Sequence, residues 1–274
     1  MPPNSPTPRP VALTFERLGT GPPLLFLHGF LGSGRNWRGI ARALADRFTC
    51  HLVDLRNHGA SPWAEPTGYE AMAADLRLLL ETQRLDGAIL LGHSMGGKAA
   101  MTLALEGCPR LRALIVVDIA PVAYVRELAP MLDALLALDL ARYRSRGEVD
   151  AALRAAVPED SLRGFLLQNL EVTGEGLRWR CNLPALRRGL PAITGFPEAL
   201  EGRRWEGPGL FLRGERSSYV EDRHVPRIRR LFPGARIVTL PDAGHWPQVE
   251  KPAETLRVLE AFLSETGTGG SNDK

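Results

Sequence analysis

A serine flanked by glycines is the first residue in this sequence whose setting suggests chemistry. Residues Gly92–Gly96 have the form G-x-S-x-G, with Ser94 at the centre, a strand-like run before it and a helix-like run after it. A serine on such a sharp turn projects its hydroxyl from a sheet, and the two glycines avoid collisions with neighbouring backbone. The following helix points its partly positive N-terminus at the same hydroxyl. The pattern predicts Ser94 as a nucleophile, against the alternative of a glycine-rich turn with an incidental serine.

A histidine near the carboxyl end of the chain is the expected general base. His245 lies in the loop after the strand-like run 235–240, and it follows Ser94 in chain order. A serine hydroxyl is a weak nucleophile until an adjacent base removes its proton. The other histidines lie in or after early strands, inside the G-x-S-x-G motif, or beside a helix, so we expect His245 to act as this base.

The acidic partner of that histidine has three candidates. Asp118 directly follows the strand-like run 114–117, which should neighbour the strand before the nucleophile. Adjacent strands lie about 4.8 Å apart, so an aspartate there can reach the imidazole and fix its tautomer. We therefore favour Asp118, with Glu215 and Asp222, from the loop after strand 209–213, as the alternatives.

Two backbone N–H groups should meet the negative charge that develops on an attacked carbonyl oxygen. Met95, the residue after the nucleophile, supplies one amide, and Phe30, in the loop after the buried run 23–28, is expected to supply the other. The side chains of both residues would then line a substrate pocket. His28 is a secondary candidate, for which we favour bracing of this loop over a chemical role.

The segments that must position these residues alternate between strand-like and helix-like character, which predicts a mostly parallel sheet flanked by helices. Short, wholly apolar runs are typical of strands buried on both faces. The expected strands are 11–18, 23–28, 50–55, 88–91, 114–117, 209–213 and 235–240. The expected helices around them are 37–48, 69–85, 95–105, 223–231 and 253–263.

The alternation stops between residues 122 and 206, where the sequence shows no strand signal. Helices are expected there at 128–143, 151–157, 162–170 and 177–186. We interpret 122–206 as a helical cap inserted into a core formed by residues 11–121 and 207–265. Three residues of its first helix are expected either to line the acyl pocket or to pack the cap on the core: Leu132, Leu135 and Leu136.

The ends of the chain and its overall composition set limits on location and partners. The proline-rich residues 1–10 predict a flexible arm without a signal peptide, and 266–274 predict a disordered tail. The chain has 274 residues, a net charge of +3 and three cysteines without a paired motif, which favours one large domain in the cytoplasm. No apolar run approaches the length of a membrane span.

The expected partner is a small-molecule ester, which the candidate reacting residues suggest, and neither nucleic acid nor a membrane is expected as a partner. Arginines are interspersed with acidic residues instead of gathering in one basic patch. No histidine–carboxylate cluster has the spacing of metal ligands, so we expect neither a metal nor another cofactor. We expect a monomer or a small homo-oligomer.

Taken together, the motifs resemble the α/β-hydrolase superfamily over about residues 11–265, and most closely small bacterial YbfF-type esterases and their mitochondrial relatives. The closer likeness is carried by residues 54–59, 92–99, 117–121 and 179–183. The resemblance implies the α/β-hydrolase fold and an acid at Asp118. It also implies that Ser217, a second secondary candidate, occupies a position where most members of the superfamily have an aspartate.

The function implied is that of a serine carboxylesterase. It would hydrolyse short- to medium-chain acyl esters, or thioesters, through an acyl-enzyme intermediate. The same residues would also suit perhydrolysis, C–C bond hydrolysis or amide hydrolysis. A ligand-binding protein without activity is the remaining alternative, and the presence of both Ser94 and His245 argues against it.

Overall fold

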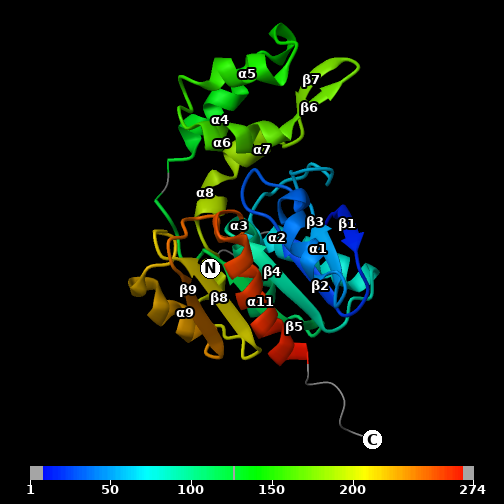
Figure 1. Cartoon of the computed structure of the whole chain (residues 1–274), viewed down its shortest axis with the longest axis vertical. Helices are drawn as coiled ribbons and strands as arrows, with labels where there is room; N and C mark the ends of the chain where they lie inside the picture. Colours follow the sequence, from blue (N-terminus) through cyan, green and yellow to red (C-terminus); the bar gives the residue numbers. More distant parts are fainter. Residues whose placement is uncertain (1–8, 126, 268–274) are drawn as a thin grey trace, which may run out of the picture.

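The computed structural model describes residues 9–125 and 127–267, and its centre is a seven-stranded sheet (Figure 1). The strand order is β1-β3-β2-β4-β5-β8-β9, with β1 antiparallel to β3 and all other neighbours parallel. The strands are β1 (Phe15–Leu18), β2 (Pro23–Leu27), β3 (Thr49–Val53), β4 (Ala88–His93), β5 (Leu111–Val117), β8 (Gly209–Gly214) and β9 (Ala235–Leu240). The predicted mostly parallel sheet is confirmed, and β9 has the predicted bounds.

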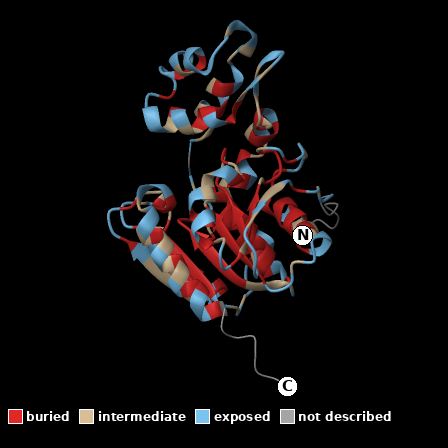
Figure 2. Ribbon diagram, turned by 45° about the vertical axis from the view of Figure 1, so that its right-hand side comes forward, coloured by how far each residue is buried: buried red, intermediate tan, exposed pale blue. Residues whose placement is uncertain are grey.

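The central strands are mostly apolar because both of their faces are covered. In β2, Leu24 and Phe26 pack into one hydrophobic cluster, whereas Leu25 and Leu27 pack into the other. Successive strand residues point to opposite faces, so each face receives every second side chain. Figure 2 shows the resulting buried strands at the centre of the larger body of the molecule.

Helices cover both faces of this sheet. The cluster that contains Leu24 and Phe26 is closed by α1 (Arg38–Leu44) and α11 (Pro252–Gly267). The cluster on the other face is closed by α2 (Tyr69–Thr82), α3 (Met95–Glu106) and α9 (Val225–Leu231). The short helix α10 (Pro247–Glu250) precedes α11, and 3-10 turns lie at Gly34–Trp37, Leu140–Arg142, Leu167–Asn169, Glu198–Leu200 and Asp222–His224.

The segment 122–206 connects two strands that are neighbours in the sheet, since β5 pairs directly with β8. Its helices are α4 (Ala129–Leu136), α5 (Arg146–Leu153), α6 (Asp160–Leu166), α7 (Leu183–Arg188) and α8 (Leu190–Thr194). In Figure 1, α4 to α7 gather above the sheet, and α8 lies between them and the larger body. The first helix predicted there, 128–143, is shorter in the structure, where α4 ends at Leu136.

The prediction that this segment contains no strand is wrong. β6 (Leu170–Thr173) and β7 (Gly176–Trp179) form an antiparallel hairpin in a region that we expected to be helical. The turn between the strands contains Gly174, and β7 begins at Gly176, whose φ of 127° favours glycine. Two β-branched residues before this turn favour a strand over a helix.

The predicted ends of the chain are only partly within the described residues. Residues 1–8 of the expected arm and 268–274 of the expected tail lie outside them. Thr266 and Gly267, which we assigned to the tail, belong instead to α11. The apolar face of this helix packs on the sheet, and the helix continues beyond the predicted end at residue 263.

Candidate active site

Ser94 lies on a strained turn between β4 and α3. Its φ of 51° and ψ of −118° are unusual for a residue with a side chain. A Cβ on Gly92 would lie 2.3 Å from the Gly96 carbonyl oxygen, and one on Gly96 would lie 2.6 Å from the Leu27 carbonyl oxygen. The turn can therefore be this tight only with glycine at both positions.

The three residues that the sequence predicts as nucleophile, base and acid lie in one hydrogen-bonded row. The Nε2 atom of His245 is 3.2 Å from the Ser94 hydroxyl oxygen, and its Nδ1 atom is 2.8 Å from a carboxylate oxygen of Asp118. Because a carboxylate only accepts hydrogen bonds, Nδ1 carries the proton and Nε2 can accept the proton of the serine.

The Asp118 carboxylate is fully buried and accepts several hydrogen bonds. One oxygen accepts the Gly214 amide at 3.0 Å, and the other accepts both His245 Nδ1 and a short hydrogen bond from the Ser217 hydroxyl. The loop after β8 thus supplies donors to the acid rather than an acid of its own. Asp118 itself has a φ of 51°, a second strained position beside the site.

The two alternative acids point elsewhere. Glu215 accepts the Asp242 amide at 3.0 Å, and Asp222 pairs with Arg213 at 2.8 Å. Neither carboxylate has a hydrogen bond to His245 within the described residues. Of the three candidates, the structure brings only Asp118 to the histidine.

Two aromatic rings that the sequence analysis did not single out hold the imidazole of His245. The Tyr219 ring stacks on it, with centroids 3.8 Å apart and planes within 17°. On another side lies the buried His93 ring, whose Nε2 atom donates to the His245 carbonyl oxygen at 2.7 Å. Burial holds the pKa of His93 well below its usual value, so this ring stays neutral.

The loop expected to supply an oxyanion donor passes directly beside the nucleophile. A Cβ on Gly29 would lie 3.4 Å from the Ser94 Cβ atom. The Phe30 and Met95 amides follow at the two sides of this contact, and neither donates to another group among residues 9–125 and 127–267. Both amides are therefore available for an oxygen bound next to Ser94.

Two buried histidines brace this loop from behind. The Nε2 atom of His28 accepts the Leu55 amide at 3.0 Å, and that of His58 accepts the Leu31 amide at 3.2 Å. Burial lowers the pKa of His28 to about 4 and that of His58 to about 3, which keeps both rings neutral and able to accept. Within the described residues His28 has no hydrogen bond to Ser94, His245 or Asp118, and its bracing role stays a prediction.

With this geometry in place, comparison with known proteins identifies the family. Residues 22–252 match the family described as alpha/beta hydrolase fold. The chain belongs to this family. The predicted resemblance and the predicted fold class are both confirmed.

Several relatives of this α/β hydrolase are similar over nearly their whole length. The mouse (Mus musculus) sn-1-specific diacylglycerol lipase ABHD11 is 39% identical over 93% of this chain and 86% of the relative. Esterase YbfF of Escherichia coli is 36% identical over 93% of this chain and 98% of the relative. A solved structure, a marine microorganism esterase, matches with a TM-score of 0.88 and 36% identity over 92% of this chain and all of that one. These likenesses show that the chain is an enzyme of the hydrolase class.

A cavity of about 850 Å³ opens over Ser94 between the sheet of the hydrolase and segment 122–206. Its apolar lining includes Phe30, Ile119, Leu128, Met131, Leu162 and Phe165. None of Leu132, Leu135 and Leu136 lines this cavity, so of the two alternatives left open for them, packing is the one that Leu132 and Leu135 follow. Leu132 and Leu135 are buried among other apolar side chains of the larger cluster, whereas Leu136 lies 39% exposed at a different groove.

A buried lysine is the most unusual group in the cavity wall. Lys98 on α3 is 1% exposed, and its Nζ atom donates to the Thr194 and Gly195 carbonyl oxygens at 3.1 and 2.5 Å. Nζ also lies 4.7 Å from the Tyr124 ring centroid. Burial lowers its pKa to about 7, while the carbonyls and the ring favour the charged form. The sequence shows Lys98 only as part of a resembling motif.

The described residues contain no group of three or more His, Cys, Asp or Glu side chains placed to hold a metal ion. Within the same ranges, no helix is both long and apolar enough to cross a membrane. The expected cytoplasmic location, the lack of a nucleic-acid partner and the oligomeric state remain predictions.

Proposed function

We propose that this α/β hydrolase is a serine carboxylesterase that cleaves short- to medium-chain acyl esters, and thioesters, through an acyl-enzyme intermediate. The observation that carries the proposal is the continuous row from Ser94 through His245 to the buried Asp118 at the floor of an apolar cavity. Relatives named esterase and lipase support it.

The mechanism follows from the proton positions in this row. His245 takes the Ser94 proton through Nε2 as the hydroxyl attacks the ester carbonyl, and Asp118 stabilises the resulting imidazolium. The Phe30 and Met95 amides bind the oxyanion. His245 then protonates the leaving alcohol or thiol, and later removes a proton from the water that hydrolyses the acyl-enzyme.

Segment 122–206 acts in this proposal as a cap over a core of residues 11–121 and 207–265. Its residues Leu128, Met131 and Phe165 form part of the apolar wall facing the nucleophile. An acyl chain bound there would leave water, so the cap would set the acyl preference.

Hydrolysis of p-nitrophenyl esters from acetate to palmitate tests the proposal. We expect turnover by the wild type and a loss of kcat by about 10⁴-fold or more in Ser94→Ala and Asp118→Asn. Glu215→Gln and Asp222→Asn are the matched controls, because each removes an alternative acid, and we expect them to keep activity. Full activity in Asp118→Asn with loss in Glu215→Gln would refute the acid assignment. No turnover of any ester by the wild type would refute the esterase.

The size of the cavity favours a second candidate, a lipase that acts on glycerol esters of longer acyl chains. A cavity of about 850 Å³ is within the range of pockets that bury a drug-sized ligand. The mouse relative is named a diacylglycerol lipase. A kcat/KM that rises from butyrate to palmitate, together with release of fatty acid from diacylglycerol, would favour this candidate over the first.

A further inference from the structure

Two connecting segments join segment 122–206 to the sheet, and they meet at Tyr124, beside the candidate active site. The Tyr124 amide, on the way out from β5, donates at 2.9 Å to the carbonyl oxygen of Thr194, the last residue of α8 on the way back. Lys98 on the nucleophile helix donates to the same Thr194 oxygen. Hydrogen bonds therefore link both connecting segments to α3, the helix that begins after Ser94.

The hydroxyl of Tyr124 continues this network toward the general base. It accepts the Ala120 amide at 2.8 Å and donates to the Tyr219 carbonyl oxygen at 2.5 Å. The two tyrosine rings are 5.2 Å apart, and the ring of Tyr219 stacks on His245. One hydroxyl therefore links the end of the Asp118 turn to the residue that supports the imidazole.

The stacked ring matters because His245 becomes positively charged in the proposed mechanism. The face of an aromatic ring carries negative potential, so Tyr219 stabilises the imidazolium over the neutral imidazole. The stack also fixes the ring plane in which Nδ1 reaches Asp118 and Nε2 reaches Ser94. A shift of the Tyr219 backbone would disturb both effects.

We propose that Tyr124 is a positioning residue for the general base. Its hydroxyl holds Tyr219 against His245. Its amide binds the Thr194 carbonyl, to which Lys98 also donates, and so links the base to segment 122–206. The proposal rests on the proposed function for its kinetic consequences. Its structural claim concerns only where the imidazole is held and how readily it takes a proton.

Tyr124→Phe tests the proposal because it removes only the hydroxyl and keeps the ring that faces Lys98. The Tyr219 carbonyl then loses the donor from Tyr124 and keeps its hydrogen bond with the His224 ring, so the stack on His245 is held less firmly. We expect kcat to fall about two- to fivefold with little change in KM, the size of one lost cation–π contact. The acidic limb of the kcat/KM profile should move to lower pH, because the imidazolium loses stabilisation.

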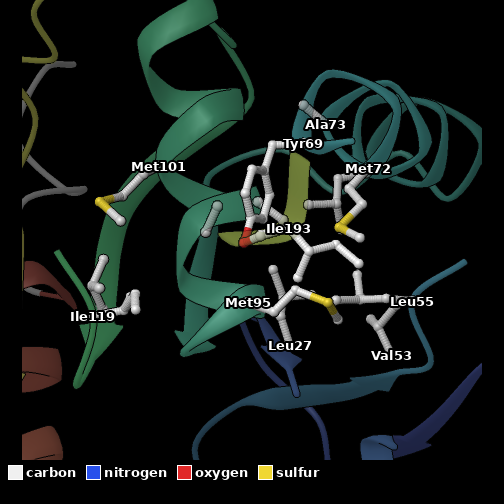
Figure 3. Packing of buried hydrophobic residues seen from close by; sticks show 14 of the residues in the cluster. Leu27, Val53, Leu55, Tyr69, Met72, Ala73, Met95, Met101, Ile119 and Ile193 are labelled. Carbon is white, nitrogen blue, oxygen red and sulfur yellow. The ribbon is translucent and has the colours of Figure 1, made fainter. Parts of the chain in front are cut away.

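Tyr69→Phe is the matched control. The Tyr69 hydroxyl donates to the Ile193 carbonyl oxygen at 2.5 Å, and the Tyr69 ring centroid lies 5.5 Å from Lys98 Nζ. Figure 3 shows the Tyr69 side chain beside Ile193. The two variants each lose one tyrosine hydroxyl and its bond to a backbone carbonyl, but only Tyr124 is bonded to Tyr219. We expect a similar loss of Tm in both variants and no shift of the His245 pKa in Tyr69→Phe.

A proton NMR titration of the His245 imidazole, without substrate, separates this proposal from the proposed function. The other titratable groups facing the ring, Asp118 and His93, are unchanged in either variant. Tyr219→Leu, which removes the stacked ring, should lower the pKa of His245 at least as far as Tyr124→Phe does. An unchanged pKa of His245 in Tyr124→Phe, or an equal shift in Tyr69→Phe, would overturn the positioning role even if ester hydrolysis is confirmed.

Discussion

Three buried neutral histidines predict that this hydrolase loses stability steeply in mild acid. His28, His58 and His93 are each at most 4% exposed, and the first two accept backbone amides at the loop beside Ser94. Burial lowers the pKa of His28 to about 4, that of His58 to about 3, and that of His93 well below its usual value. In the unfolded chain the same side chains titrate near about 6.5.

The sign and size of the effect follow from this difference. Because the folded-state pKa values are lowered, stability is complete above about pH 6.5 and is lost as the pH falls toward the folded values. At about pH 5 each unfolded histidine has gained about 2 kcal/mol by binding a proton that the folded ring does not bind. His28 and His58 together cost about 4 kcal/mol at this pH, a large part of the whole stability of many domains, and His93 adds to the loss in the same direction.

Urea unfolding of wild type and His58→Gln across this pH range measures the effect. Glutamine can accept the Leu31 amide in place of Nε2 but does not titrate. We expect the free energy of unfolding to fall less steeply in the variant, by about 1.4 kcal/mol per pH unit. All other titrating groups, such as the buried Asp75, are common to both proteins, so the difference in slope isolates this histidine. Equal slopes would refute the reasoning.

Three further predictions concern packing and specificity. Arg56→Met should lower the free energy of unfolding by about 3–5 kcal/mol in urea titrations. The Asp75 carboxylate is fully buried and pairs with Arg56 at 2.6 Å, and the variant leaves this charge without its partner. Gly96→Ala should abolish ester hydrolysis, since its Cβ would lie 2.6 Å from backbone; an active, folded variant would contradict the elbow geometry. Met131→Trp should lower the decanoate-to-butyrate ratio of kcat/KM about tenfold, whereas Leu132→Ala should cost about 2–5 kcal/mol of stability and leave that ratio unchanged.

The sequence predicted the sheet and the row of reacting residues because both depend on local signals. The strand-like run 235–240 has the length and bounds of the strand that forms, and the two glycines around Ser94 make a motif that can be recognised in the sequence. Asp118 could be favoured because β5 had to lie next to β4 for the chain to follow the ordinary rules of parallel sheets.

The segment 122–206 was predicted less well because its elements are short and depend on each other. The hairpin did have a signal, since Val172 and Thr173 precede a turn with two glycines, but apolar spacing suggested a helix. Leu132 is adjacent in sequence to Met131, and only the rotation of α4 decides which of them faces the cavity. Such a rotation is set by packing against other helices, which one segment alone does not reveal.

Tyr219 and Lys98 escaped prediction for another reason, because their partners come from distant parts of the chain. The stack of Tyr219 on His245 joins the loop after β8 to the loop after β9, and Lys98 reaches carbonyls at the end of α8. No spacing within either loop indicates such contacts. The available signals were a tyrosine, Tyr219, in a loop expected near the predicted base, and a lysine, Lys98, in a helix predicted to be buried.

The position of the acid accounts for what the loop after β8 does instead. The carboxylate that contacts His245 comes from the end of β5, so the loop after β8 does not place one there. This loop instead donates hydrogen bonds to Asp118 from the Gly214 amide and the Ser217 hydroxyl. A fully buried carboxylate needs such donors to remain ionised. The same loop continues into Tyr219, which covers the opposite partner of the ion pair, the imidazole. One loop would therefore support both the negative and the positive member of the ion pair that forms in the proposed mechanism.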